Sequence, residues 1–147
     1  MLKQTGTVHA LDGVSLHVKP HETLGLVGES GCGKSTLGRT VIRLYQPTYG
    51  EVHFDGQEIG GLKEKQLGFV RRNMQMIFQD PYSSLNPRRT ISSIIEKPMH
   101  VHNWGTKKEI KDRVVYLLDR VGLGSWALNR YPHEFSGGQR QRVAIAR

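Results

Sequence analysis

Gly28-Glu29-Ser30-Gly31-Cys32-Gly33-Lys34-Ser35 is the stretch of this 147-residue sequence that decides its fold. It fits the pattern G-x-x-x-x-G-K-[ST], the phosphate-binding loop known as the P-loop. Glycine lets such a loop turn tightly and brings backbone N–H groups close to phosphate oxygens. Lys34 supplies a mobile positive charge for the β- and γ-phosphates, and the Ser35 hydroxyl is placed to bind Mg²⁺. The stretch therefore predicts a site for a nucleoside triphosphate.

The residues on either side of the loop support this interpretation. The run Leu24-Gly25-Leu26-Val27 is short and apolar, which is typical of a strand buried on both faces. After the loop, apolar side chains recur at helical spacing at Leu37, Val41, Leu44 and Tyr45. The pattern predicts a strand, the loop and then a helix. The phosphates would then lie at a helix N-terminus, where the helix dipole favours anions.

Periodicity and turn residues predict the remaining elements. The alternating run over residues 14–19 predicts a half-buried, antiparallel strand. A second strand is expected over residues 51–54, before a tight turn at Asp55-Gly56, and a third, buried strand over residues 74–78. Helices are expected over residues 64–72, from Thr90 to about Lys97 with an end near Pro98, from the capping box Thr106-x-x-Glu109 to Gly122, and after a second capping box, Ser136-x-x-Gln139. The third of these carries Ile110, Val114, Leu117, Leu118 and Val121 on one face.

Composition narrows the class of protein. No stretch approaches the roughly 18 apolar residues of a membrane span, and no apolar region near the N-terminus signals secretion. The single cysteine excludes an intramolecular disulfide and suits the cytosol. The net charge is +8, which would suit nucleic acid or an anionic membrane surface. We interpret this charge as a solvated surface.

Three motifs, in this order, resemble the ATPase subunits of ABC transporters. They are the P-loop, Gln79 at the end of a predicted strand, and Phe135-Ser136-Gly137-Gly138-Gln139-Arg140-Gln141-Arg142. Longer strings over residues 25–36, 77–87 and 130–139 are similar to the oligopeptide/dipeptide importer branch. The resemblance covers nearly all of the chain. It implies an α/β fold, with an incomplete P-loop NTPase core and an antiparallel β element in residues 1–78, and the Q-loop with a helical signature subdomain in residues 79–147.

The resemblance also implies roles for individual residues. Gln79 resembles the Q-loop glutamine, which binds Mg²⁺ together with Ser35 and orients water; Lys34 and Gln79 are the expected catalytic residues. The expected nucleotide contacts are Gly28, Glu29, Ser30, Gly31, Cys32, Gly33, Lys34, Ser35 and Thr36, and, for the nucleotide of a partner domain, Ser136, Gly137, Gly138 and Gln139. The residues alone also allow a purely structural interpretation, in which Gln79 is a polar residue at a strand end and Ser136 is an ordinary helix N-cap.

The function that the resemblance implies is that of the ATP-binding subunit of an importer for oligopeptides or dipeptides. Its cofactors are ATP and Mg²⁺. Its partners are a second ABC ATPase domain, in a head-to-tail homo- or heterodimer, and transmembrane permease subunits. No nucleic acid partner is expected, and the location is peripheral, at the cytoplasmic face of the cell membrane. The alternatives are a nucleotide-binding fragment without turnover, and a non-transport ABC ATPase of DNA repair or translation, which only the positive charge favours.

The chain departs from the family pattern at three places. Phe135 stands where the family usually has leucine. No aromatic residue precedes Tyr45 to stack on adenine, so either the N-terminus is trimmed or another residue, such as His9, takes that place. The Walker B aspartate, the catalytic glutamate and the switch histidine of the family lie downstream of Arg147, so we expect the chain to be a fragment of a larger ATPase. The sequences His100-x-His102 and His133 are interpreted as surface histidines and not as metal ligands.

Overall fold

A computed structural model describes residues 9–78 and 84–147 of the chain. The chain divides into two compact units, which we call the N-terminal unit (residues 1–75) and the C-terminal unit (residues 76–147). The predicted division of roles after residue 78 stays a prediction. Within the described residues, the helices are too short or too polar to cross a bilayer.

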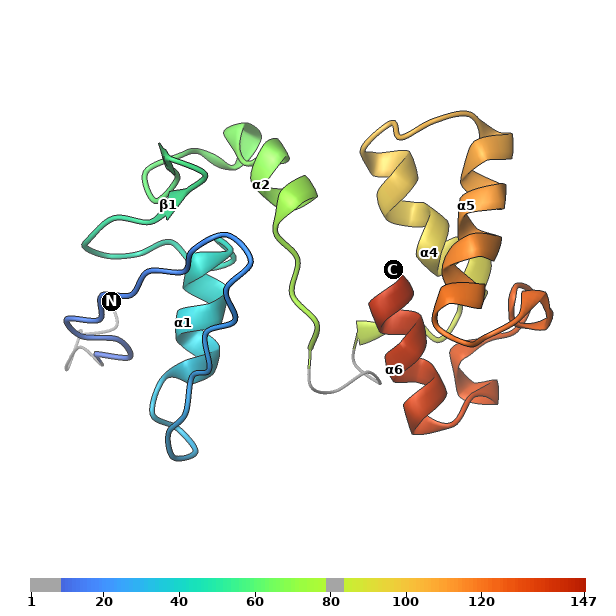
Figure 1. The fold of residues 1–147 in the computed structure, drawn as a ribbon, viewed down its shortest axis with the longest axis horizontal. Coiled ribbons are helices and arrows are strands. Elements are labelled where there is room, and N and C mark those ends of the chain that lie inside the picture. The colour runs from blue at the N-terminus through green and yellow to red at the C-terminus, as the bar shows by residue number, and fades with distance from the viewer. Residues whose placement is uncertain (1–8, 79–83) are drawn as a thin grey trace, which may run out of the picture. The chain divides into compact units, whose positions relative to one another are not determined.

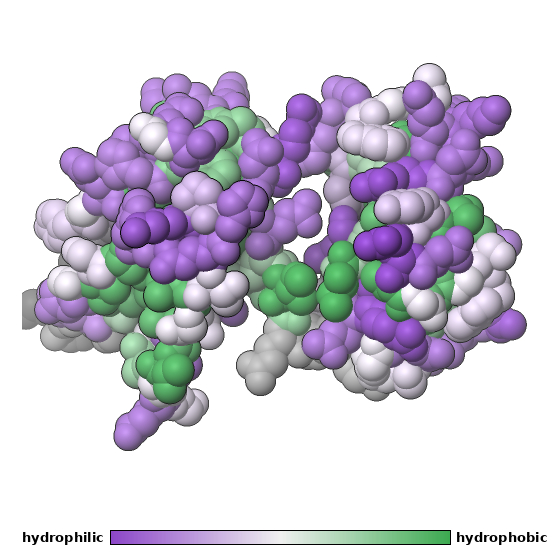
Figure 2. Space-filling view, viewed as in Figure 1, coloured by the Kyte–Doolittle hydropathy of each residue, from purple (hydrophilic) through white to green (hydrophobic). Residues whose placement is uncertain are grey.

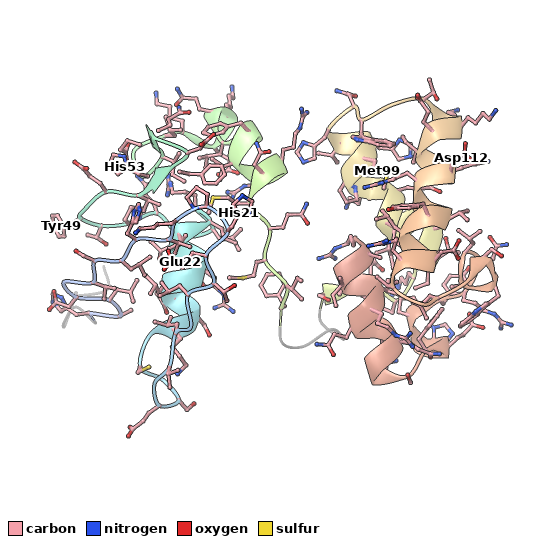
Figure 3. All side chains as sticks on the ribbon, in the orientation of Figure 1. His21, Glu22, Tyr49, His53, Met99 and Asp112 are labelled. Carbon is pink, nitrogen blue, oxygen red and sulfur yellow. The ribbon has the colours of Figure 1, made fainter. Side chains whose placement is uncertain are left out.

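The C-terminal unit is a packed group of helices (Figure 1). Its elements are α4 (Ile91–Val101), α5 (Lys107–Arg120), α6 (Gly137–Ala146) and two short 3-10 helices, η2 (Ser125–Ala127) and η3 (Pro132–Glu134). One side of each helix enters a shared apolar core formed by Leu85, Ile91, Ile94, Ile95, Val114, Leu118, Leu123, Ala127, Phe135, Val143 and Ala146. Met99 of α4 packs against this core, whereas Asp112 of α5 is exposed (Figure 3). The core therefore spans nearly the whole length of this unit.

The predicted capping box at the start of α5 is confirmed. The Glu109 backbone N–H donates to Thr106 Oγ1 at 3.3 Å, and the Thr106 N–H donates to Glu109 Oε2 at 2.8 Å. The Thr106 hydroxyl also donates to Glu109 Oε2, at 2.7 Å, and the bonds from the Thr106 N–H and hydroxyl to this carboxylate hold the pKa of Glu109 below its usual range. At the other end, Gly122 has φ of +69°, in the left-handed region that favours glycine and stops the helix as predicted.

The predicted end of α4 near Pro98 is wrong, because the helix continues to Val101 with Pro98 inside it. Proline has no N–H to donate to the carbonyl one turn earlier. The helix is nevertheless held from both sides of this gap. Ile94 and Ile95 are buried in the core before it, and the His102 N–H donates to the Pro98 carbonyl at 3.0 Å after it. Burial of the apolar face thus outweighs the lost hydrogen bond.

In the N-terminal unit, the helix α1 (Lys34–Val41) follows the P-loop, and β1 (His53–Phe54) and β2 (Gln57–Glu58) form a small hairpin. The strands are antiparallel, and Phe54 pairs with Gln57. The predicted turn between them is confirmed: Asp55 and Gly56 have φ of +50° and +76°, as a two-residue hairpin turn requires. The predicted helix over residues 64–72 forms in two pieces, η1 (Glu64–Gln66) and α2 (Gly68–Asn73).

Two arginines join the elements of the N-terminal unit. Arg43, with 5% of its surface exposed, donates from Nε to the Ile59 carbonyl at 2.7 Å and from Nη2 to the Leu62 carbonyl at 3.0 Å. Arg71 of α2 donates to the carbonyls of Ile42 and Arg43 at 2.6 and 2.8 Å. All four are charge-assisted bonds, and the two from Arg71 reach carbonyls directly after α1, where a helix end leaves carbonyls without intrahelical donors. They fix α1 against the hairpin and α2.

Three of the predicted strands are wrong. Residues 14–19, 24–27 and 74–78 do not form strands, and among the described residues only β1 and β2 pair. Apolar side chains of the first two runs are exposed, including Val27 at 95%, and Figure 2 shows apolar surface on this unit. A strand needs a hydrogen-bonded neighbour and an apolar face to pack on. No described residue supplies the neighbour, so these runs form no sheet.

We expect Leu118→Ala to lower the free energy of unfolding of the C-terminal unit by about 2–5 kcal/mol, because this fully buried side chain would leave a cavity in the core. Urea denaturation followed by circular dichroism measures the change. Val101→Ala is the control, since Val101 of α4 is 66% exposed, and its effect should stay within about 0.5 kcal/mol. Equal destabilisation by the two variants would contradict the core described here.

Candidate functional site

The P-loop of the N-terminal unit takes a shape that requires glycine. Gly31 and Gly33 have φ of +87° and +96°, which side chains rarely allow. At Gly33 the space is also closed, because an added Cβ would lie 2.7 Å from the Ala10 carbonyl oxygen. The segment next to His9 therefore lies beside the end of the loop. His9 itself is exposed, and its predicted place against adenine stays a prediction.

The N-terminus of α1 lacks the side-chain cap that the other helices of comparable length carry. Gly33 is its N-cap and offers no side chain, and no acidic residue occurs in its first turn. The first intrahelical bond runs from the Leu37 N–H to the Gly33 carbonyl at 2.8 Å. The N–H groups of Lys34, Ser35 and Thr36 come before that bond, where a helix leaves its donors without an intrahelical acceptor. This end of α1 therefore presents backbone donors and the positive end of a helix dipole.

The Lys34 side chain folds back across the loop. Its Nζ donates to the carbonyls of Gly28 and Glu29 at 2.6 and 2.5 Å and lies 3.4 Å from Cys32 Sγ. A Cβ added at Gly28 would lie 2.7 Å from that Sγ and 3.9 Å from Nζ, so a side chain there would crowd the loop interior. The loop thus concentrates a cation and backbone N–H groups in one glycine-lined turn. This donor set fits the charged oxygens of a phosphate group.

The other predicted P-loop residues lie in the loop and the first turn of α1. Ser35 is exposed at the second position of α1, so its hydroxyl is accessible to a hard cation such as Mg²⁺. Ser30 is exposed in the loop, and the Thr36 carbonyl accepts from Thr40 Oγ1 at 2.8 Å inside α1. Gln79, the second predicted Mg²⁺ ligand, lies outside the described residues. Its role beside Ser35 stays a prediction.

The signature segment, residues 136–139, opens α6 in the C-terminal unit. Its predicted capping box is confirmed: the Gln139 N–H donates to Ser136 Oγ at 3.3 Å, and the Ser136 N–H donates to Gln139 Oε1 at 2.8 Å. Ser136, Gly137 and Gly138 are exposed. A hydroxyl that accepts one bond keeps its own hydrogen to donate. The capped helix end can therefore still offer a hydroxyl donor and first-turn N–H groups to an anion.

Phe135 was named as part of the signature motif, but the contacts that support the signature segment were missed by sequence reasoning. Phe135 is buried and stacks on Trp126, with ring centroids 5.4 Å apart. Glu134 accepts from the Tyr131 N–H at 2.7 Å and from Arg130 Nη1 at 2.6 Å. These bonds, that from Tyr131 first, hold the pKa of Glu134 below its usual range, so it stays ionised at neutral pH. The contact between Trp126 and Phe135 joins residues nine positions apart, which no simple period links, whereas Glu134 binds residues three and four positions before it.

The predicted site residues thus form two groups, the P-loop in the N-terminal unit and the signature segment in the C-terminal unit. Histidines outside these two groups have local surroundings of their own. His53 pairs with Glu51 at 2.8 Å and is exposed, like His21 (Figure 3). His133 stacks on the Tyr131 ring at 5.7 Å, and His100 lies 3.7 Å from a carboxylate oxygen of α4.

Comparison with known proteins identifies relatives along the whole chain. The family described as ABC transporter matches residues 11–147. The chain is 58% identical, over 99% of its length, to the oligopeptide transport ATP-binding protein AppF of Bacillus subtilis, and 54% identical, over 97%, to the glutathione import ATP-binding protein GsiA of Pectobacterium atrosepticum. These matches cover 44% and 23% of the relatives. The chain therefore spans less than half the length of either.

A solved structure with the same fold is the dimeric ATP-binding cassette MJ0796 in a post-hydrolysis state with ADP and Pi. The TM-score is 0.83 at 34% identity, and the match covers 93% of this chain and 60% of that one. Another is CbiO1 of Clostridium perfringens, part of an ABC transporter complex, with a TM-score of 0.78 at 30% identity over 93% of this chain and 53% of that one. The fold class predicted from the resemblance is confirmed, although the strand before the P-loop does not form.

We expect Lys34→Ala to weaken ATP binding by about 1.5–3 kcal/mol or more, because it removes a charge-assisted contact with the phosphates. Titration with a fluorescent ATP analogue measures the loss. Lys65→Ala, an exposed lysine of the same unit, is the matched control and should bind as the unchanged chain does. Equal affinity of Lys34→Ala and the unchanged chain would show that the loop does not bind the nucleotide.

We expect maleimide modification of Cys32 to block nucleotide binding, because the added bulk fills the turn in which Lys34 Nζ lies 3.4 Å from the sulfur. Cys32 is exposed and is the only cysteine, so labelling is specific. Mg-ATP should slow the labelling, measured by mass spectrometry against time. Cys32→Ser, which should bind ATP but take no label, controls for modification elsewhere. Labelling rates that Mg-ATP leaves unchanged would count against the proposed position of the phosphates.

Proposed function

The chain belongs to the ABC transporter family, and from this we propose that it is part of the ATP-binding subunit of an importer for oligopeptides or dipeptides. The named relatives support the substrate class, since one is an oligopeptide transport protein and another a glutathione import protein, and glutathione is itself a short peptide. The subunit would work at the cytoplasmic face of the membrane, bound to transmembrane permease subunits. The observation that carries nucleotide binding is the uncapped N-terminus of α1 with Lys34 folded over the glycine turn.

In this proposal the residues of the P-loop bind and orient ATP. The N–H groups at the start of α1 donate to phosphate oxygens, and Lys34 exchanges its two carbonyl partners for the β- and γ-phosphates. The Ser35 hydroxyl and the Gln79 amide oxygen hold Mg²⁺, which neutralises charge on the phosphates when bound. Gln79 also orients the attacking water. Acceleration by these residues comes from positioning and charge neutralisation, as in other phosphoryl transfers.

The signature segment acts on the nucleotide of a partner domain. Ser136 donates its hydroxyl hydrogen, and Gly137 and Gly138 donate their N–H groups, to the γ-phosphate bound by the partner's P-loop. Two such domains arranged head to tail then share two nucleotides, and closure of the dimer moves the permease. The dimeric state of the MJ0796 cassette supports this arrangement. Whether the partner is a second copy or a related chain follows from the transporter's composition and not from these residues.

A second candidate function is nucleotide binding without turnover. It is favoured by one observation: the P-loop by itself provides phosphate contacts, with Lys34 Nζ folded over the glycine turn beside the uncapped start of α1. A non-transport role in DNA repair or translation is favoured only by the net charge of +8. Copurification with a permease subunit, against binding to nucleic acid, distinguishes the transport role from this third one.

We expect a polypeptide of residues 1–147 to bind ATP weakly and to hydrolyse it negligibly. It lacks the carboxylates that complete metal binding and polarise water, and a positioned acid–base group alone is worth about 10²–10⁴ in rate. A steady-state phosphate-release assay measures turnover. Extending the polypeptide with the downstream half of the AppF protein should restore hydrolysis, and Ser136→Ala should lower it again. Robust Lys34-dependent hydrolysis by residues 1–147 alone would contradict this account.

A further inference from the structure

The joint between η3 and α6 is held by a side-chain stack. Phe135 and Ser136 both have extended backbone, at φ, ψ of −109°, 147° and −64°, 164°, so neither lies inside a helix. The Phe135 ring is 3% exposed and lies nearly parallel to the Trp126 indole, with an interplanar angle of 17°. Because Ser136 follows Phe135 directly, the position of the Phe135 ring determines where the signature segment begins.

Trp126 is itself fixed from its other side. It belongs to η2, whose Ala127 is fully buried in the core of the C-terminal unit. A Cβ added at Gly124 would lie 3.2 Å from Trp126 Cδ1, so the edge of the indole lies against the backbone there. The Trp126 side chain remains 56% exposed, which is a large apolar surface for a residue with no chemistry of its own at the site. Its contacts therefore point to a supporting role.

A second contact joins α6 to the same neighbouring stretch. Arg142 Nη1 donates to the carbonyls of Val121 and Gly122, both at 3.2 Å, just after the end of α5. The residues 121–127 thus meet the signature helix at two points, before its first turn through Trp126 and in its second turn through Arg142. Two separated contacts oppose rotation of α6 about its axis. They therefore determine the direction in which its first-turn donors face.

We infer that Trp126 is a positioning residue for the signature segment. Its stack with Phe135 aligns the Ser136 hydroxyl and the N–H groups of Gly137 and Gly138 with the phosphate held by a partner domain. The inference rests on the proposed function of that segment, and Trp126 acts on the segment through Phe135, on which its ring stacks. Loss of the stack should weaken binding to the partner's nucleotide and leave the chain's own P-loop affinity unchanged, because the P-loop lies in the other unit.

The first test measures the joint without any nucleotide. The amide of Gln139 donates to Ser136 Oγ, so its hydrogen-exchange rate, read by nuclear magnetic resonance, reports the order of the joint. Trp126→Ala should exchange about three- to tenfold faster, the range that an aromatic pair is worth. Trp126→Phe should restore the rate, because it keeps a stacking ring. Trp104→Ala is the matched control, since Trp104 is 51% exposed in the same unit and its ring meets Arg113 of α5 instead.

An exchange rate in Trp126→Ala equal to that of the unchanged chain would overturn the inference. So would equal acceleration in Trp104→Ala, because that result would mean general loosening of the unit. Where Trp126→Ala fails to fold by circular dichroism, Gly124→Ala takes its place. Its backbone, at φ, ψ of −75°, −179°, accepts alanine, while the new Cβ must push the indole edge by a few tenths of an ångström. Faster exchange supports the inference, and an unchanged rate overturns it.

The second test measures association of the full chain in Mg-ATP by analytical ultracentrifugation, with P-loop affinity measured in parallel by a fluorescent ATP analogue. Trp126→Ala should weaken ATP-dependent association about three- to tenfold, and Trp126→Phe should restore it. Nucleotide affinity should remain within twofold in both. Association unchanged in Trp126→Ala overturns the inference. Absence of ATP-dependent association in the unchanged chain overturns the proposed role of the signature segment instead, and the exchange rate of Gln139 then decides the position of Trp126.

Discussion

Every α-helix begins with backbone N–H groups that need an acceptor, and the candidate site depends on how that need is met. Helices α4, α5 and α6 meet it internally, with the side-chain oxygens of Thr90, Thr106 and Ser136. Helix α1 begins after Gly33, which has no side chain to offer. Its donors are left for a ligand that carries negative charge. The same residue makes the turn possible, since its positive φ and its contact with Ala10 exclude any side chain.

The signature helix α6 shows that a capped terminus can still recognise an anion. The Ser136 hydroxyl accepts from the Gln139 N–H, which stabilises the helix by about 1 kcal/mol in typical cases. That bond uses a lone pair and leaves the hydroxyl hydrogen free to donate. Stability and recognition thus do not compete for the same atom. Recognition also requires that the donors face the anion. In this fold we infer that the stacking of the Phe135 ring on Trp126 sets the direction of these donors.

The two units are stabilised by different interactions. In the C-terminal unit, isoleucine, valine and leucine side chains from every α-helix meet in one core. In the N-terminal unit the apolar cluster is small, centred on Ile59, Leu67 and Val70. There the guanidinium groups of Arg43 and Arg71 bind backbone carbonyls around the end of α1. Such bonds are directional, so they fix the helix that carries the P-loop even where little apolar area is buried.

Local features of this protein were determined by the sequence by itself. The P-loop, the capping boxes at Thr106 and Ser136, the turn at Asp55-Gly56 and the buried face of α5 each depend on residues within a few positions of one another. Backbone conformation and short-range hydrogen bonds settle such features before distant parts of the chain meet. They were sufficient to predict these local structures, whereas the fold class was predicted from the family resemblance and the roles of the site residues stay predictions.

Only the tertiary structure decided the features that need a distant partner. The apolar runs at 14–19, 24–27 and 74–78 read as strands, yet none forms, because strand pairing needs hydrogen bonds from a neighbour that no described residue supplies. Pro98 reads as a helix end, yet packing of Ile94 and Ile95 carries α4 past it. The contact between Phe135 and Trp126 joins residues nine positions apart, and no periodic spacing in the sequence indicates this contact. Pairing and packing are non-local, and their energies appear only when the elements come together.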